Sequence, residues 1–449
     1  MSLQESQRSP SPSEGLFAKR VATDCGWNGF ADSRRERRIR KPVWMSDPGL
    51  VIVGGGQAGV QAAASAREKG YAGPVDLISE EAELPYQRPH LSKGFLDGAN
   101  GGALAPLRTS AWFHSNGIRL RTGERVVTID RRACRVITES GATPYTNLVV
   151  ATGARNRALS IPGAPRDVMR YLRSASDARV LREQLVGGIA VAIVGAGFIG
   201  LEVAAMAAKR NCNVTVIESQ GRVLSRAVSP LMSNFLRDAH EKAGVRIRTG
   251  CAVVCAERTD SRWCLRLGNG DMVPCDLIVV GVGVVPNDDL ARSAGLAVDD
   301  GVLVDDRLQT SDPNIWAIGD CVRFPESISG TVVRLESVQN ACDQARTVAR
   351  SLVGEVQPHR SVPWFWSEQY SHKLQIAGLR NTNDQCILRG PRERGRFSAF
   401  HFARDRLTAV ESINDPSVHL AARRLLAGDT TRLSPSQAAD SAFDLKSLT

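Results

Sequence analysis

Residues 51–59 read VIVGGGQAG, an apolar strand that runs directly into a G-x-G-x-x-G fingerprint. An Ala-rich segment follows, and then a second apolar run, residues 75–79, ends immediately before Glu80. In this order the glycines let the backbone approach a pyrophosphate at a helix N-terminus, and the acid accepts hydrogen bonds from an adenosine ribose. The stretch therefore predicts a βαβ unit of the Rossmann type that binds a dinucleotide.

A second copy of this pattern begins about 140 residues later. Residues 191–200 read VAIVGAGFIG, and a further apolar strand, residues 214–217, ends at Glu218. One glycine fingerprint is weak evidence, but two complete copies in one chain indicate two dinucleotides. Nicotinamide is a diffusing hydride carrier and flavin a resident electron store, so FAD with NAD(P)H is the natural pair. A doubly wound protein whose second glycine loop binds nothing is the alternative.

The second acid also bears on the choice between the two nicotinamide dinucleotides. Glu218 would hydrogen-bond the 2′-hydroxyl of NADH and repel the 2′-phosphate of NADPH. Ser219 and Gln220 follow it without a positive charge, and Arg222 is the nearest cation in the sequence. The sequence therefore predicts NADH as the substrate.

Composition and charge exclude several classes of protein. The 449 residues include 43% hydrophobic and 23% charged residues, as in ordinary globular proteins, and carry a net charge of +10. No run approaches the roughly 20 apolar residues that span a membrane. No basic stripe is interleaved with aromatic residues, so nucleic acid is not expected, and the modest positive charge suits an acidic protein partner. The chain is long enough for two or three domains.

The first 46 residues differ in texture from the rest. They are rich in Ser and Pro at the start, continue into the basic run RRERRIRK at 34–41, and show no hydrophobic periodicity. No apolar segment follows the arginines, as an export signal would require, and the acids in this region are unlike a mitochondrial transit peptide. We expect a disordered tail, with Met45 as an alternative natural start.

Further motifs lie beyond the two fingerprints. They are YQRPHLSKG at 86–94, IWAIGDC at 315–321, LESVQNA at 335–341 and PWFWSEQY at 363–370. With the fingerprints, they resemble the FAD-dependent pyridine nucleotide-disulphide oxidoreductase superfamily, in its ferredoxin reductase branch, over about residues 47–445. Within that branch the chain is most similar to the putidaredoxin reductases, and next to the ferredoxin reductase components of aromatic-ring dioxygenases.

The resemblance implies an α/β fold with two Rossmann-type dinucleotide-binding domains, for FAD and NAD, and a C-terminal α/β interface domain. It places the FAD-binding domain at residues 47–165 and 285–360. The NAD-binding domain is residues 166–284, and the C-terminal reductase domain is residues 361–449.

The resemblance also assigns contacts with the two cofactors. Gly54, Gly56, Ala58 and Gly59 would hold the FAD pyrophosphate, and Gly195, Gly197 and Gly200 would do the same for NADH. Asp320 would reach the ribityl chain, although a plain helix N-cap is the alternative for such a carboxylate. The other residues of the implied FAD site are Glu80, Arg88, Val126, Arg173, Val338 and Trp366. Taken alone, Arg173 could be a surface ion pair and Trp366 ordinary core.

Lys93 and Glu202 are the predicted catalytic pair. The resemblance places Lys93 beside the flavin ring and Glu202 on the first turn of the NAD-domain helix. Such a pair could hold the flavin and nicotinamide rings in register for hydride transfer, and a cation near the flavin stabilises an anionic reduced ring. An interdomain salt bridge without a chemical role is the alternative.

The positions of the cysteines indicate how electrons would leave the flavin. The chain has 10 cysteines but no C-x-x-C pair, and the loop at 90–93 reads HLSK without a cysteine. They are typical of reduced cytoplasmic thiols, and no metal site is expected from the scattered histidines. Without a dithiol, electrons must leave from the flavin itself, and without a four-cysteine cluster the acceptor must be a separate protein.

These observations predict an NADH:ferredoxin oxidoreductase. Hydride from NADH would reach FAD, and single electrons would pass to an acidic [2Fe–2S] ferredoxin that serves a cytochrome P-450 monooxygenase. The alternatives are the ferredoxin reductase component of a ring-hydroxylating dioxygenase, a rubredoxin reductase, an NADH oxidase or peroxidase, and a non-catalytic flavoprotein of the apoptosis-inducing-factor kind.

Overall fold

The first glycine fingerprint forms the strand, turn and helix that its sequence predicts. The computed structural model describes residues 48–98, 102–259, 262–428 and 433–448, so the predicted tail at 1–46 lies outside the described residues. The apolar run becomes strand β1 (Gly49–Val53), and helix α1 (Gln57–Glu68) begins directly after Gly56. The alanines of α1 have high helix propensity and small side chains, so the helix packs close to its neighbours.

A mixed sheet of seven strands carries this unit. Its spatial order is β3 (Ile118–Arg121), β2 (Val75–Ile78), β1, β6 (Gly141–Val150), β5 (Arg135–Thr138) and β4 (Val126–Asp130), with β18 (Ile315–Ala317) along β6. The long strand β6 pairs parallel with β1 and β18 through its C-terminal half and antiparallel with β5 through its N-terminal half. The last strand, β18, thus returns from a distant part of the chain to complete the sheet.

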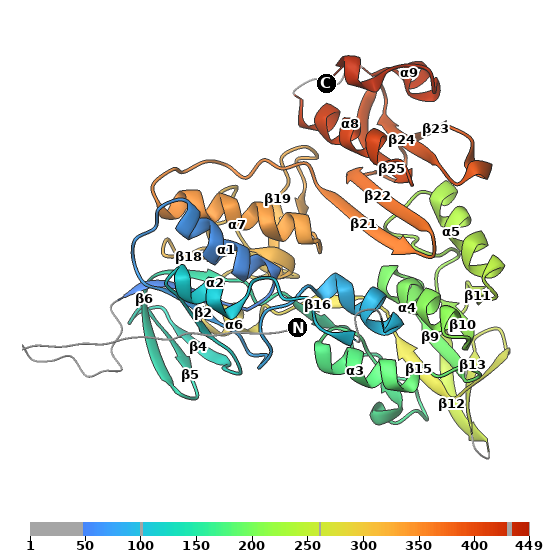
Figure 1. Cartoon of the computed structure of the whole chain (residues 1–449), viewed down its shortest axis with the longest axis horizontal. Coiled ribbons are helices and arrows are strands. Elements are labelled where there is room, and N and C mark those ends of the chain that lie inside the picture. Colours follow the sequence, from blue (N-terminus) through green and yellow to red (C-terminus); the bar gives the residue numbers. More distant parts are fainter. Residues whose placement is uncertain (1–47, 99–101, 260–261, 429–432, 449) are drawn as a thin grey trace, which may run out of the picture. The chain divides into compact units, whose positions relative to one another are not determined.

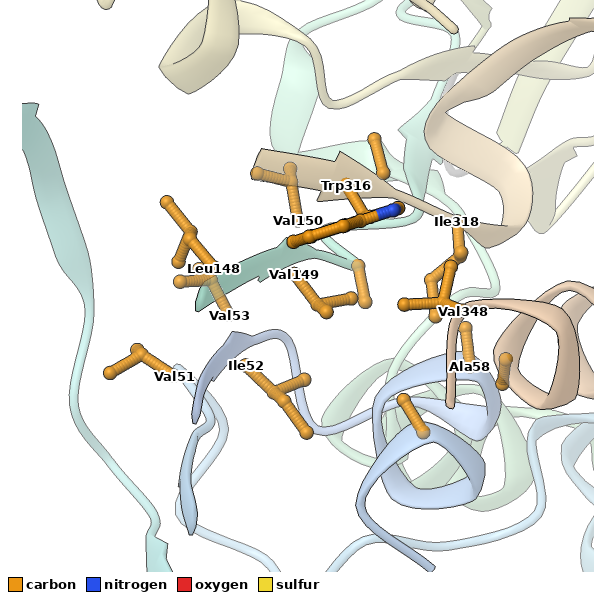
Figure 2. Close-up of a cluster of buried hydrophobic side chains, with 14 of the residues drawn as sticks. Val51, Ile52, Val53, Ala58, Leu148, Val149, Val150, Trp316, Ile318 and Val348 are labelled. Carbon is orange, nitrogen blue, oxygen red and sulfur yellow. The ribbon is translucent and has the colours of Figure 1, made fainter. Parts of the chain in front are cut away.

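The core of this part lies between the sheet and two helices. Helix α7 (Val338–Leu352) packs against α1 (Figure 1). Side chains of β1, β6 and β18 gather beside Ala58 of α1 and Val348 of α7 (Figure 2). Trp316 of β18 belongs to this cluster and is only 8% exposed. Burial of these apolar surfaces stabilises the sheet edge from which the first glycine loop projects.

The second fingerprint builds a parallel sheet of its own. Its order is β11 (Arg246–Thr249), β10 (Asn213–Glu218), β9 (Ala190–Val194), β15 (Leu277–Val280) and β8 (Met169–Arg170). Helix α4 (Phe198–Lys209) follows the glycine loop as α1 follows the first. An antiparallel meander joins β11 to β15; it comprises β12 (Val253–Thr259), β13 (Arg262–Leu267) and β14 (Met272–Cys275). Every strand in the parallel sheet ends toward the glycine loop, which is the expected position of a ligand site.

The C-terminal part is an antiparallel sheet covered by a helix. The sheet order is β21 (Trp364–Gln369), β22 (His372–Gly378), β25 (Arg406–Ile413), β24 (Phe397–Ala403) and β23 (Gln385–Arg389). Helix α8 (Pro416–Ala427) packs on β22 and β25 through a face that includes Ala422 and Leu425. Figure 1 shows these elements in orange and red.

The remaining elements connect or cover the three sheets. The strands are β7 (Ala154–Asn156) paired with β16 (Val284–Pro286), and β17 (Val302–Leu303), β19 (Val322–Pro325) and β20 (Val332–Val333) in a small sheet. The helices are α2 (Ser110–Ser115), α3 (Ala175–Gln184), α5 (Pro230–Lys242), α6 (Asp289–Ser293) and α9 (Pro435–Ala439). Among the described residues, no helix is both long and apolar enough to cross a bilayer.

Candidate dinucleotide-binding site

Both glycine loops open into one continuous cavity of about 1770 Å³. A pocket for one small ligand usually measures roughly 300–1,000 Å³, so this cavity has room for more than one such molecule. Nearly all predicted site residues line it; they are Gly54, Gly56, Ala58, Glu80, Arg88, Lys93, Val126, Arg173, Gly195, Gly197, Glu202, Glu218, Asp320, Val338 and Trp366. Gly59 and Gly200 are the two that do not.

The three glycines of the first loop have different physical roles. Gly54 has φ of +121°, and a Cβ there would lie 2.1 Å from the carbonyl oxygen of Ala151. A Cβ on Gly59 would lie 1.9 Å from the carbonyl oxygen of Gly54, so this glycine lets α1 pack against the loop. A Cβ on Gly56 would meet no protein atom within 4 Å. Gly56 therefore leaves space on the cavity side, where a pyrophosphate would approach the helix N-terminus.

The second loop repeats this arrangement. Gly195 has φ of +107° and lies against Gly281, whose carbonyl oxygen would be 2.4 Å from an added Cβ. A Cβ on Gly200 would collide with the carbonyl oxygen of Gly195 at 2.1 Å. On Gly197 the nearest atom would be 3.8 Å away. As in the first loop, the last glycine allows close helix packing and the middle one faces the cavity.

The two acids at the strand ends differ in how firmly they are held. Glu80 is exposed, and its nearest ionic partner is Arg125 at 3.6 Å. Glu218 accepts hydrogen bonds from the backbone N–H of Ala196 at 2.7 Å and of Gln220 at 2.9 Å. These bonds fix the Glu218 carboxylate beside the second glycine loop.

The cation nearest to Glu218 in sequence is not available to a ligand phosphate. Arg222 donates to the carbonyl oxygens of Val228 at 2.9 Å and of Ser225 at 2.6 Å. Its guanidinium group is therefore engaged within its own turn. The charge around the end of β10 favours a free hydroxyl over a phosphate.

Predicted residues from distant segments of the chain also meet in the cavity lining. Arg173 pairs with Asp320 at 3.2 Å, and Arg88 donates to the backbone carbonyl of Arg173 at 2.8 Å. Asp320 is the middle residue of a single 3₁₀ turn (Gly319–Cys321) that leads into β19, and the N-cap of that turn is Ile318. Val126 begins β4 and Val338 begins α7, so two further elements present apolar side chains to the same space.

Aromatic side chains form one wall of the cavity. Trp366 lies on β21 with its ring centroid 5.6 Å from that of Trp364. Phe365, from the same strand, contacts Phe198 at the start of α4, with centroids 4.5 Å apart. The indole Nε1 of Trp364 is buried and has no hydrogen-bond partner among the described residues. The wall therefore offers flat apolar surface to the cavity.

Lys93 and Glu202 form an ion pair in the cavity wall. The Lys93 Nζ lies 2.8 Å from Glu202 Oε2, and the two side chains are 19% and 3% exposed. Lys93 lies in a π-helical turn (Leu91–Phe95), and Glu202 is the fifth residue of α4, at the start of the second turn and just past the expected first turn. Ser92 donates to the same carboxylate oxygen, and Ser367 of β21 donates to Glu202 Oε1 at 2.7 Å. Such complete hydrogen bonding allows a carboxylate to stay charged when it is buried.

Comparison with known proteins places this arrangement in a family. The family model described as pyridine nucleotide-disulphide oxidoreductase matches residues 48–345, and the model described as reductase C-terminal matches residues 364–449. The chain belongs to the pyridine nucleotide-disulphide oxidoreductase family. Within it, the chain is a member of the ferredoxin reductases, an FAD-dependent oxidoreductase that uses NAD(H), as the sequence predicts.

Three relatives show how far the similarity extends. Rhodocoxin reductase of Rhodococcus erythropolis is 46% identical over 399 residues, covering 88% of this chain and 93% of its own. The ferredoxin reductase for the CYP199A2 system of Rhodopseudomonas palustris has a TM-score of 0.85 at 42% identity. The match covers 89% of this chain and 99% of that protein's chain. Putidaredoxin reductase in its covalent complex with putidaredoxin has a TM-score of 0.85 at 37% identity. The match covers 90% of this chain and 98% of that protein's chain. The predicted superfamily, fold class, enzyme class and cofactors are thus confirmed.

The residues present fit FAD. The cavity side of Gly56 is free of protein atoms, the loop glycines allow close backbone approach, and the aromatic wall suits a flat ring system. The open space at Gly56 and the close backbone approach are properties that a dinucleotide site requires. The fit of the second loop to NADH rests on the same geometry and on the fixed Glu218 carboxylate.

Sequence reasoning missed several residues in the cavity wall or directly behind it. Ser92 and Ser367 hold the Glu202 carboxylate, and both lie beside predicted residues, Lys93 and Trp366, in the quoted motifs. Arg226 and Arg380 also line the cavity, from the loop after β10 and from the loop after β22. No local pattern distinguishes either arginine from a solvated surface charge.

Proposed function

We propose that this chain is an NADH:ferredoxin oxidoreductase that supplies single electrons to an acidic [2Fe–2S] ferredoxin in the cytoplasm, and that this ferredoxin serves a cytochrome P-450 monooxygenase. The observation that carries the proposal is the opening of both glycine loops into one cavity with the Lys93–Glu202 pair in its wall. In this reading the FAD part comprises residues 47–165 and 285–360, the NAD part residues 166–284 and the C-terminal part residues 361–449.

The proposed FAD contacts follow from the positions of the lining residues. Bound FAD supplies the capacity to accept a hydride and to release the electrons one at a time. Gly54, Gly56 and Ala58 would hold its pyrophosphate, and Glu80 its ribose. The contacts toward the ribityl chain and ring would be Arg88, Lys93, Val126, Arg173, Asp320, Val338 and Trp366. On the other side, Gly195 and Gly197 would hold the pyrophosphate of NADH and Glu218 its ribose hydroxyl.

The distribution of cysteines supports electron exit to a separate protein. Among the described residues that line the cavity, Cys251 is the one cysteine, and it comes from the loop after β11. Burial raises the pKa of the Cys251 thiol, which disfavours the reactive thiolate. A redox pair beside the flavin would need a second thiol there. This favours a ferredoxin over a disulphide as the acceptor.

Two of the three relatives support a monooxygenase chain. One is the ferredoxin reductase for a CYP system, and another is joined to putidaredoxin. The dioxygenase component, the rubredoxin reductase and the non-catalytic flavoprotein of the apoptosis-inducing-factor kind would share the same cavity, so acceptor specificity distinguishes them.

A panel of acceptors tests the proposal. We expect the purified protein to be yellow, to release FAD on denaturation, and to catalyse NADH-driven reduction of a P-450-type [2Fe–2S] ferredoxin at least about tenfold faster than that of a dioxygenase ferredoxin or a rubredoxin. The rate should fall as salt rises, because charge attraction speeds the encounter with an acidic partner. Bleaching by NADH without turnover on any ferredoxin would refute the reductase and favour the non-catalytic alternative.

The proposed role of Glu218 predicts the choice of dinucleotide. NADH should exceed NADPH by at least about tenfold in kcat/KM, roughly 1.4 kcal/mol. Glu218→Gln removes the charge and keeps an oxygen for one of the two backbone N–H groups, which donate to different carboxylate oxygens, so it should narrow this gap. Glu218→Ala with Ser219→Arg should close or reverse it. Steady-state kinetics with both substrates measure the ratio, and Ser219→Arg alone is the control. A wild-type preference for NADPH would contradict the assignment.

A further inference from the structure

A buried histidine lies between the parallel sheet of the second fingerprint and the C-terminal sheet. His240 of α5 is 0% exposed, and burial lowers its pKa to about 4, so the ring is neutral at physiological pH. Its Nε2 lies 2.9 Å from Gln369 Oε1, and its Nδ1 lies 3.0 Å from the Tyr370 hydroxyl. Both ring nitrogens are therefore engaged by residues of the C-terminal part.

The contacts continue from this histidine to the predicted catalytic pair. Gln369 Nε2 donates to Ser367 Oγ at 3.1 Å, and Ser367 Oγ donates to Glu202 Oε1 at 2.7 Å. Ser367 and Gln369 are 0% and 1% exposed, so water does not compete for these bonds. An unbroken series of hydrogen bonds thus joins Tyr370 to Glu202. We name these residues, Tyr370, His240, Gln369, Ser367 and Glu202, the carboxylate chain.

The charge on Glu202 fixes the direction of every bond in the carboxylate chain. A carboxylate paired with the Lys93 ammonium only accepts hydrogen bonds, so Ser367 must donate its single hydroxyl proton to it. Ser367 Oγ then accepts from the amide nitrogen of Gln369, which turns the amide oxygen toward His240. The His240 ring must in consequence carry its proton on Nε2 and accept from Tyr370 at Nδ1. Bonds aligned in this way polarise one another.

The backbone at the end of the carboxylate chain is strained. Tyr370 has φ of +55°, in the left-handed region, within the turn that joins β21 to β22. For a residue that is not glycine this conformation costs about 1 kcal/mol. The strain is offset where it brings a functional contact, and here it places the hydroxyl of Tyr370 on His240.

We propose that Ser367, Gln369, His240 and Tyr370 are positioning residues for hydride transfer, which hold the Glu202 carboxylate in one orientation toward Lys93. The inference rests on the proposed role of Lys93 and Glu202. It gives the C-terminal part a function in the NADH half-reaction in addition to covering the cavity. It also means that hydride transfer requires β21 to keep its position relative to α4 and α5.

The first test measures the ring of His240 in the oxidised protein without turnover. In protein labelled with ¹⁵N-histidine, the signals lost in His240→Gln identify the residue. We expect protonated Nε2 and unprotonated Nδ1, and this tautomer should persist from pH 8 to about pH 5. A ring that is protonated on Nδ1, or one that titrates near pH 6.5, would overturn the carboxylate chain whatever the enzyme's activity.

The second test compares two buried serines of the same sheet. Ser367→Ala should slow the anaerobic reduction of bound FAD by NADH about tenfold, while the Kd of NAD⁺ changes less than about twofold, because the lost bond goes to a charged group. Ser367→Cys keeps a weak donor and should give an intermediate rate. Ser398→Ala is the matched control, since Ser398 is equally buried and donates only to Ser412 among the described residues.

The outcomes separate the inference from the function on which it rests. Equal rates in Ser367→Ala and Ser398→Ala, in folded protein with full FAD content, would overturn the positioning role. A wild-type rate in Glu202→Gln would instead refute the role of the catalytic pair. The His240 tautomer is decided independently of both.

Discussion

Gly56→Ala is expected to give a folded protein that no longer retains FAD, and Gly197→Ala a yellow protein that no longer responds to NADH. In each variant the added methyl group meets no protein atom within 3.5 Å and points into the cavity, at the place where a pyrophosphate would contact the backbone. Loss of close hydrogen bonds to a charged group should weaken binding of the respective dinucleotide at least about a hundredfold.

Three measurements check that each variant loses one dinucleotide and not the other. FAD content follows from the absorbance spectrum after purification, NADH affinity from anaerobic titration, and folding from circular dichroism. Gly221→Ala is the matched control, because its Cβ also meets nothing within 4 Å and Gly221 does not line the cavity. Retention of FAD by Gly56→Ala would place the cofactor elsewhere.

Glu202→Gln is expected to slow the reduction of bound FAD by NADH about a hundredfold, with FAD content unchanged. The substitution keeps the shape of the side chain and its contact with Ser367, but removes the charge that orients the Lys93 ammonium. Removal of one oriented charged group from an active site typically has an effect of about this size or larger. Stopped-flow spectroscopy without oxygen measures the step directly.

A control is available in another ion pair. Asp312→Asn neutralises a carboxylate that is 14% exposed and lies 2.7 Å from Arg131, and neither residue lines the cavity. It should leave the rate unchanged. If both variants slow reduction equally, the effect of Glu202 is one of stability, since loss of one partner of a buried pair is destabilising in general.

The sequence predicted the repeated elements well because their signals are local. The apolar runs at 75–79 and 214–217 become β2 and β10, and the Ala-rich segment after the first fingerprint becomes α1. Each depends on periodicity, a glycine turn or a capping residue within a few positions.

What the sequence could not predict arises from long-range pairing. Ser367 meets Glu202 across 165 positions, and Gln369 meets His240 across 129. A single serine or glutamine on a strand carries no sign of such a partner, because its role is set by the register of β21 against two helices. The fingerprint likewise does not separate glycines that face the cavity, such as Gly56 and Gly197, from glycines that let a helix pack closely against its loop.

Strand β18 has a consequence for how the chain folds during synthesis. It completes the first sheet along β6, yet about 165 residues separate Val150 from Ile315. At about 5–20 residues per second, a ribosome needs roughly 10–30 s to supply it. All strands of the parallel sheet of the second fingerprint, from β8 to β15, lie between Val150 and Ile315 in the sequence. The part that we assign to NADH can therefore close while the part that we assign to FAD is still waiting for its last strand, and the flavin would be acquired late.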